Sequence, residues 1–145
     1  MKMHSRIGLG LTLIVLASAG CGTTEPPAPC SGDINVTVRG EFQPTFDWSR
    51  RCGISSLSVL KLSTQPGELD KMVWGFSVSE RQPVGPSIVY GNNPVGSTVS
   101  HQPETLVPGA QYRVTILYTV GGDGIVASGS TTFVGQWGPD QPTKW

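Results

Sequence analysis

The chain has 145 residues, of which 37% are hydrophobic and only 14% charged, and its formal net charge is zero. This length suits one domain with short appendages. A net charge of zero argues against a nucleic-acid-binding protein and against attraction to acidic lipid through a basic patch. The 19 glycines and 12 prolines favour many short strands joined by turns over long helices.

Residues 1–20 have the organisation of an export signal. A positively charged start is followed by an apolar run from Ile7 to Gly20, which is short for a transmembrane helix. The run ends in small residues directly before Cys21, in the sequence "SAGC". This segment resembles the signal of bacterial lipoproteins, with Ser18 at the position where leucine is usual.

The resemblance implies that residues 1–20 are a lipoprotein signal peptide and that Cys21 becomes the first residue of the mature protein. Its sulfur would then carry a diacylglyceryl group, and the acyl chains would anchor the protein to a bilayer of the bacterial cell envelope. Gly22 after the cysteine favours the outer membrane in cells that have one. An ordinary secretory signal with a cysteine near its cleavage site is the alternative.

Residues 21–32 are interpreted as the lipidated cysteine and a proline-rich tether. If Cys21 carries lipid, Cys30 and Cys52 remain as an even pair in an oxidising compartment. We predict a disulfide between them, which would close a loop of about twenty residues and stabilise the fold by about 3 kcal/mol. A metal or redox pair is disfavoured, because no histidine lies near either cysteine in the sequence.

From residue 33 onward, apolar and polar residues alternate in short runs that end in turn residues. The period of two predicts strands over residues 34–38, 42–49, 55–63, 72–78, 87–91, 97–101, 112–120 and 125–134. Phe42 is expected on the inner face together with Phe46 and Trp48. The run at 55–63 is apolar on both sides, which indicates a strand covered on both faces or twisted at its middle.

The run at 97–101 is weak, and the topology between Val89 and Thr105 is the least determined. About seven strands are therefore expected, and we predict an all-β fold, an antiparallel two-sheet sandwich. The domain is expected to span residues 33–135, with a tail at 136–145.

One motif suggests the type of sandwich. Leu106, Pro108, Gly109 and Tyr112 fit the pattern L-x-P-G-x-x-Y, which resembles that of fibronectin type III domains, and Trp48 resembles the core tryptophan of their second strand. The resemblance covers about residues 33–135 and implies an immunoglobulin-like sandwich. It further implies that the Tyr112 ring packs in the core and that its hydroxyl bonds to the backbone a few residues upstream. Such a fold does not specify a function.

Catalytic residues are hard to assemble from this chain. His101 is the one histidine left after removal of the signal, and no G-x-S-x-G nucleophile motif is present. Glu68 and Asp70 are close in sequence but belong to a turn-like stretch. The ligands for a zinc site are missing. We therefore expect a protein that is not an enzyme and has no cofactor or metal.

Aromatic residues are the better candidates for binding. Trp74 is expected in the core with its apolar neighbours, whereas Tyr90 precedes a turn-rich loop and its ring is expected to be exposed. Trp137 and Trp145 lie in the tail. Either Trp137 folds back onto the edge of the sandwich while Trp145 stays free, or the tail is a docking peptide for a partner protein.

We therefore expect a membrane-anchored envelope lipoprotein that displays a non-catalytic interaction or structural module. Its partners would be the bilayer, through acylated Cys21, and an envelope protein or a glycan, but no nucleic acid. The alternative function is a carbohydrate-binding module that uses exposed aromatic rings, which Tyr90, Trp74 and Trp137 would supply.

Overall fold

The computed structural model describes residues 25, 27–40, 42–121 and 124–136. The expected signal peptide, Cys21, Trp137 and Trp145 lie outside these residues. Within them the chain forms nine strands and one short 3₁₀ turn, η1 (Ser49–Arg51), and no α-helix. The strands are β1 (Gly32–Asp33), β2 (Val36–Arg39), β3 (Thr45–Trp48), β4 (Ser56–Lys61), β5 (Lys71–Ser77), β6 (Ile88–Val89), β7 (Thr98–His101), β8 (Gln111–Val120) and β9 (Gly124–Val134).

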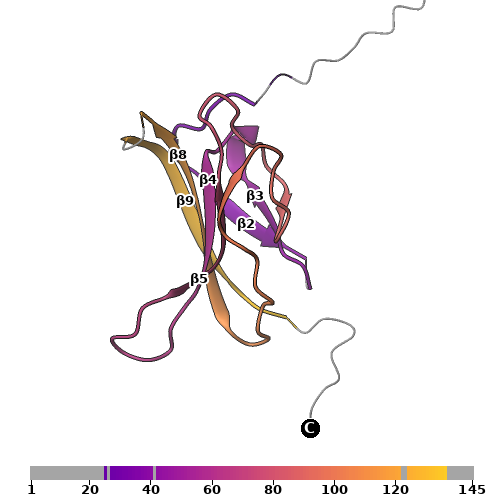
Figure 1. Ribbon diagram of the computed structural model, residues 1–145, viewed down its shortest axis with the longest axis vertical. Coiled ribbons are helices and arrows are strands. Elements are labelled where there is room, and N and C mark those ends of the chain that lie inside the picture. The colour runs from indigo at the N-terminus through magenta and orange to yellow at the C-terminus, as the bar shows by residue number, and fades with distance from the viewer. Residues whose placement is uncertain (1–24, 26, 41, 122–123, 137–145) are drawn as a thin grey trace, which may run out of the picture.

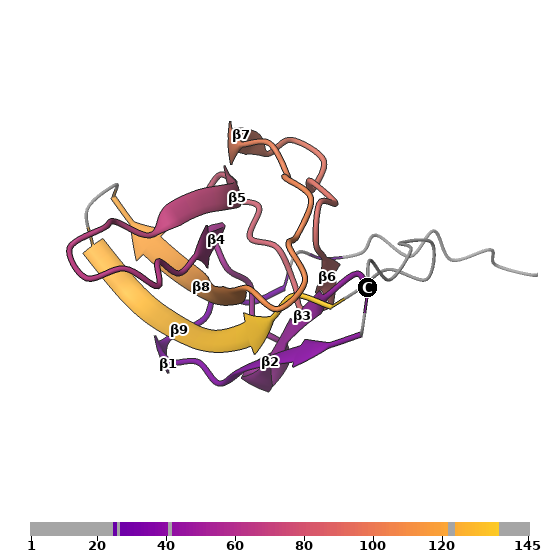
Figure 2. The same ribbon diagram turned by 90° about the horizontal axis from the view of Figure 1, so that it is seen from below.

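The strands form two sheets, as predicted. One sheet has the order β1-β9-β8-β4-β5-β7 and the other the order β2-β3-β6. All pairs are antiparallel except β1 with β9. In Figures 1 and 2 the larger sheet curves around one side of β2 and β3. The expected number of strands was about seven, and two of the nine, β1 and β6, are only two residues long.

Alternation along each strand determines which side chains reach the core between the sheets. Tyr112, Val114 and Ile116 on β8 are at most 1% exposed, while their polar neighbours point outward. On β4, Leu57 and Val59 are buried, and the pairing with β5 shifts register between Val59 and Leu60. The sequence left open a strand covered on both faces or one twisted at its middle, and a β-bulge, which increases the local twist, lies at this point.

Phe42 is a correction to the sequence prediction. It was expected on the inner face beside Phe46 and Trp48, but β3 begins only at Thr45 and Phe42 is 52% exposed. The backbone bends at residues 42–43, so Phe42 falls outside the alternation that Pro44, Phe46 and Trp48 keep as buried residues.

The expected tether also ends earlier than residue 32. Gly53 donates its N–H to the carbonyl of Ala28 at 2.7 Å, and Cys30 donates to the carbonyl of Gly53 at 2.9 Å. β1 then pairs with Ala127 and Ser128 of β9. The predicted disulfide between Cys30 and Cys52 is present. Residues 28–33 are therefore part of the folded domain, held by backbone bonds as well as by the disulfide.

Candidate functional site

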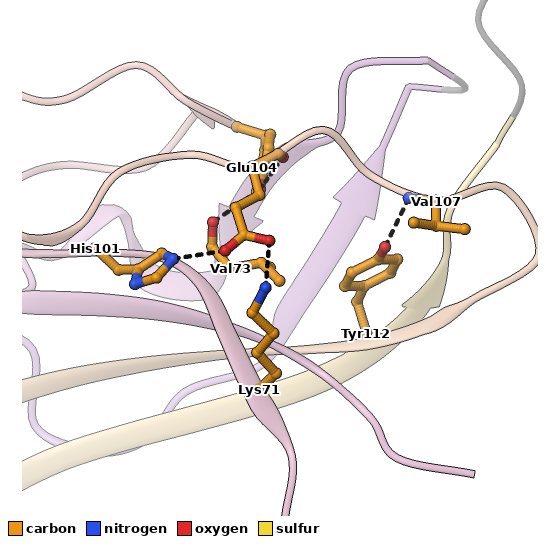
Figure 3. A network of polar contacts seen from close by, with 7 residues as sticks. Lys71, Val73, His101, Glu104, Val107 and Tyr112 are labelled. Carbon is orange, nitrogen blue, oxygen red and sulfur yellow. Dashed lines mark hydrogen bonds and ion pairs between the residues drawn. The ribbon is translucent and has the colours of Figure 1, made fainter.

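The segment Glu104–Pro108, which leads from β7 to β8, is held at both ends by hydrogen bonds that its backbone N–H groups donate. Glu104 donates its N–H to the carbonyl of Val73 at 2.9 Å. Val107 donates its N–H to the Tyr112 hydroxyl at 2.7 Å, as Figure 3 shows. Pro108 and Gly109 then form a tight turn, closed by Ala110 N–H to Val107 carbonyl at 3.2 Å, with Gly109 at φ 77°. Proline followed by a positive-φ glycine is the arrangement of a type II turn.

Tyr112 holds this corner from inside the domain. Its side chain is 1% exposed, and its ring stacks on Phe133 with centroids 5.4 Å apart. Leu106 is half-buried against the same core, and Trp48 is 5% exposed with its indole N–H donated to the carbonyl of Cys52 at 2.8 Å. All three side chains pack in or against the hydrophobic core.

Replacing Tyr112 with phenylalanine should lower the free energy of unfolding by about 1 kcal/mol, because the Val107 N–H loses its acceptor while the ring is kept. Urea denaturation measures the change. Tyr118→Phe is the matched control, since the Tyr118 hydroxyl lies 3.5 Å from the Glu80 carbonyl and should contribute less. Equal unfolding curves for Tyr112→Phe and the native protein would contradict the role of the hydroxyl.

A polar cluster on the surface holds the other end of the segment. The Glu104 carboxylate accepts from Lys71 Nζ at 2.8 Å and from His101 Nε2 at 2.9 Å, and Figure 3 shows the two side chains reaching it from β5 and β7. Lys71 and then His101 lower the pKa of the Glu104 carboxyl. An ionised carboxylate only accepts hydrogen bonds, so in this contact the ring N–H of His101 lies on Nε2. The cluster ties the segment Glu104–Pro108 to both strands.

The burial of Tyr90 is the second correction to the sequence prediction. Its ring was expected to be exposed, but it is 8% exposed and meets Trp74 edge-on, with centroids 5.2 Å apart. The hydroxyl donates to the carbonyl of Glu104 at 2.7 Å and lies 3.2 Å from that of Val73. Burial raises the pKa of Tyr90 to about 12. The ring is buried because its partners Trp74, Val73 and Glu104, each 14 to 17 residues away in the chain, surround it in the folded domain.

Trp74 is fully buried, as expected, and its indole N–H donates to Asn93 Oδ1 at 2.9 Å. Trp74 and Tyr90 therefore cannot offer flat rings to a sugar. Of the three aromatic residues considered for a glycan platform, only Trp137 is left, and it lies outside the described residues. A platform of coplanar rings built on Trp74 and Tyr90 is excluded by their burial.

An apolar hollow lies along the segment Glu104–Pro108, and we call it the end groove. It has a volume of about 560 Å³ and is lined by Phe42, Gln43, Tyr90, residues 104–108 and Gln136. Phe42 and Val107 are 52% and 47% exposed there. Another hollow, of about 800 Å³, lies on the outer side of β2 and β3, but its walls are mostly polar and include the Arg39–Asp47 ion pair. Apolar walls on a held backbone are typical of a binding surface, which favours the end groove.

The sequence could not reveal this groove. Its walls come from residues before β3, from the segment between β7 and β8 and from the end of β9. The L-x-P-G-x-x-Y motif identified one wall, but as a feature of the fold. The exposure of Phe42 could not be predicted, because the alternation in the sequence placed its side chain on the inner face.

Comparison of the chain with protein-family models, with curated proteins and with solved structures finds no match. In the described part of the chain, no helix is long and apolar enough to cross a membrane. The same residues contain no group of three or more histidine, cysteine, aspartate or glutamate side chains that could hold a metal ion.

Proposed function

We propose that this protein is a lipid-anchored module of the bacterial cell envelope. In this proposal Cys21 carries the acyl chains, the preceding residues are removed, and a non-catalytic sandwich is displayed for contact with another envelope component. The signal-like sequence before Cys21 and the disulfide, which forms in oxidising compartments, both support it.

The observation that carries the proposal is the position of the N-terminal segment relative to the end groove. β1 pairs with Ala127 and Ser128, which lie in the first half of β9. Val134, which pairs with Gln111, is the last residue of β9. Ala127 and Val134 are seven residues apart, which is about 23 Å along a strand. The first described residues lie at the opposite end of the domain from the C-terminal end of β9 (Figure 1). An anchor at Cys21 would thus leave the end groove facing away from the membrane.

We also infer that the sandwich is of the fibronectin type III kind. Three features support this inference: β2, β3 and β6 pair in one sheet, β9, β8 and β4 are neighbours in the other, and the Tyr112 hydroxyl bonds back to Val107. In immunoglobulin-like sandwiches the first, second and fifth strands share a sheet, and the last two strands and the third share the other. Folds of this kind commonly carry their contact surfaces on loops at one end.

Replacing Cys21 with serine should abolish incorporation of radioactive palmitate, because the sulfur that would carry the diacylglyceryl group is lost. Labelling in a bacterial host followed by immunoprecipitation measures this, with the label counted per molecule of protein. The matched control is the double variant Cys30→Ser/Cys52→Ser, which changes the same residue type and should keep the label.

Two outcomes would contradict the anchor. Label retained on Cys21→Ser would place the acyl chains elsewhere. A native protein that carries no label and stays in the soluble fraction would instead fit the ordinary secretory signal.

A further inference from the structure

We propose that the end groove binds the side chain of Trp137, the residue that follows Gln136. The chain would then cover its own apolar surface. The groove then holds an intramolecular aromatic anchor in the resting protein, and any outside partner must displace it. This inference does not depend on acylation of Cys21, because it concerns only the far end of the domain.

The first argument is the path of the chain as it leaves β9. Gly135 is buried, donates its N–H to the carbonyl of Ala110 at 2.9 Å, and accepts from the N–H of Gly109 at 2.9 Å. A Cβ atom at Gly135 would lie 2.4 Å from the carbonyl oxygen of Val107. A glycine is therefore needed here. It allows the backbone at the end of β9 to lie directly against Val107, which is part of the groove wall.

The second argument is reach. Gln136 is itself part of the groove lining, and Trp137 is the next residue. Consecutive Cα atoms are about 3.8 Å apart, so the Cα of Trp137 lies within about 7.6 Å of that of Gly135 in any conformation. Trp145 is eight residues further along the chain and is under no such constraint.

The third argument is chemical fit. The groove, of about 560 Å³, exposes Phe42 and Val107 to water at 52% and 47%. An indole buries about 150–250 Å² when it packs against apolar walls. Large buried aromatics are also the usual anchors of peptide contacts. If Trp137 covers the groove, the side chains of Phe42, Val107 and Trp137 itself are all removed from water in one contact.

Acrylamide quenching of tryptophan fluorescence tests the proposal on the full chain reconstituted in phosphatidylcholine vesicles. Trp48 and Trp74 are buried in the domain, so their signal is a constant background. The contribution of Trp137 is the difference between Trp145→Phe and the double variant Trp137→Phe/Trp145→Phe. The contribution of Trp145 is obtained in the same way from Trp137→Phe. We expect a lower quenching constant for Trp137 than for Trp145.

Placing a charge in the groove should release the indole. Val107→Asp, made in the Trp145→Phe protein, should raise the quenching constant of Trp137 to the value measured for Trp145. Val120→Asp is the matched control: Val120 is 49% exposed, much like Val107, but lies at the other end of β8. It should leave the quenching unchanged. Phe42→Ser provides a second groove variant should Val107→Asp fail to fold.

Three results would overturn the proposal. Trp137 could be as accessible as Trp145 in the otherwise native protein. Its shielding could survive both groove variants, which would mean that it is buried elsewhere, such as in the vesicle. Its shielding could also disappear on dilution of the protein, which would make a second copy the source of the occupant. Failure of palmitate labelling would leave this inference untouched, so the two proposals are tested separately.

Discussion

Replacing Trp74 with alanine should lower the free energy of unfolding by about 4 kcal/mol, within the range of about 3–5 kcal/mol measured when buried aromatic residues are truncated. Trp74 has no exposed surface and lies at the centre of an aromatic cluster. Its ring is 5.4 Å from that of Phe76, 5.2 Å from that of Tyr90 and 6.3 Å from that of Phe46. Truncation would remove these contacts and leave a cavity that the two sheets cannot close without moving.

Chemical denaturation followed by circular dichroism measures this change. Leu69→Ala is the matched control, because Leu69 is also a large apolar residue but is 91% exposed. Its stability should stay within about 0.5 kcal/mol of the native value. A small loss for Trp74→Ala, similar to that of Leu69→Ala, would contradict the burial of the indole. It would also restore Trp74 as a candidate for a surface site.

Removing the disulfide should be the second large effect. We expect the double variant Cys30→Ala/Cys52→Ala to lose about 3 kcal/mol, the value that the chain-entropy model gives for a loop of this size. The two cysteines are 22 positions apart and are 2% and 8% exposed. Small domains have free energies of unfolding of about 5–15 kcal/mol. A loss of this size is therefore a substantial part of the total.

Equilibrium urea denaturation of the double variant and of the native protein measures this loss. Changing both cysteines avoids a free buried thiol, which would confuse the comparison. The single variant Cys21→Ser keeps the disulfide and should unfold at the same urea concentration as the native protein. If the double variant and the native protein unfolded together, the backbone bonds of Ala28, Cys30 and Gly53 would be sufficient to hold the N-terminal segment.

The segment Glu104–Pro108 connects the stability of the domain with its candidate site. The Tyr90 hydroxyl and the Val73 carbonyl bind its first residue, and Tyr112 binds Val107. Its outer side carries the Glu104 cluster with Lys71 and His101. Because the backbone is fixed at both ends, this wall of the end groove exists before anything binds to it, and binding need not order it.

Part of this structure could be predicted from the sequence because the signals are local. The alternation over residues 112–120 places Tyr112, Val114 and Ile116 on one face, and it needs no knowledge of the neighbouring strands. The disulfide could be predicted by elimination, since only two cysteines remain once Cys21 is assigned to lipid. The Pro-Gly pair before Tyr112 likewise requires a turn whatever the surroundings.

The tertiary structure decided the features that depend on partners far apart in the chain. Tyr90 is buried because its ring packs on Trp74 and its hydroxyl donates a hydrogen bond to the carbonyl of Glu104, fourteen residues later. Phe42 is exposed because the backbone bends at residues 42–43, before β3 begins. The end groove joins Phe42, the segment Glu104–Pro108 and Gln136, which are brought together only when the two sheets pack. Alternation reports which face a side chain takes within a strand, but burial outside strands depends on what packs there.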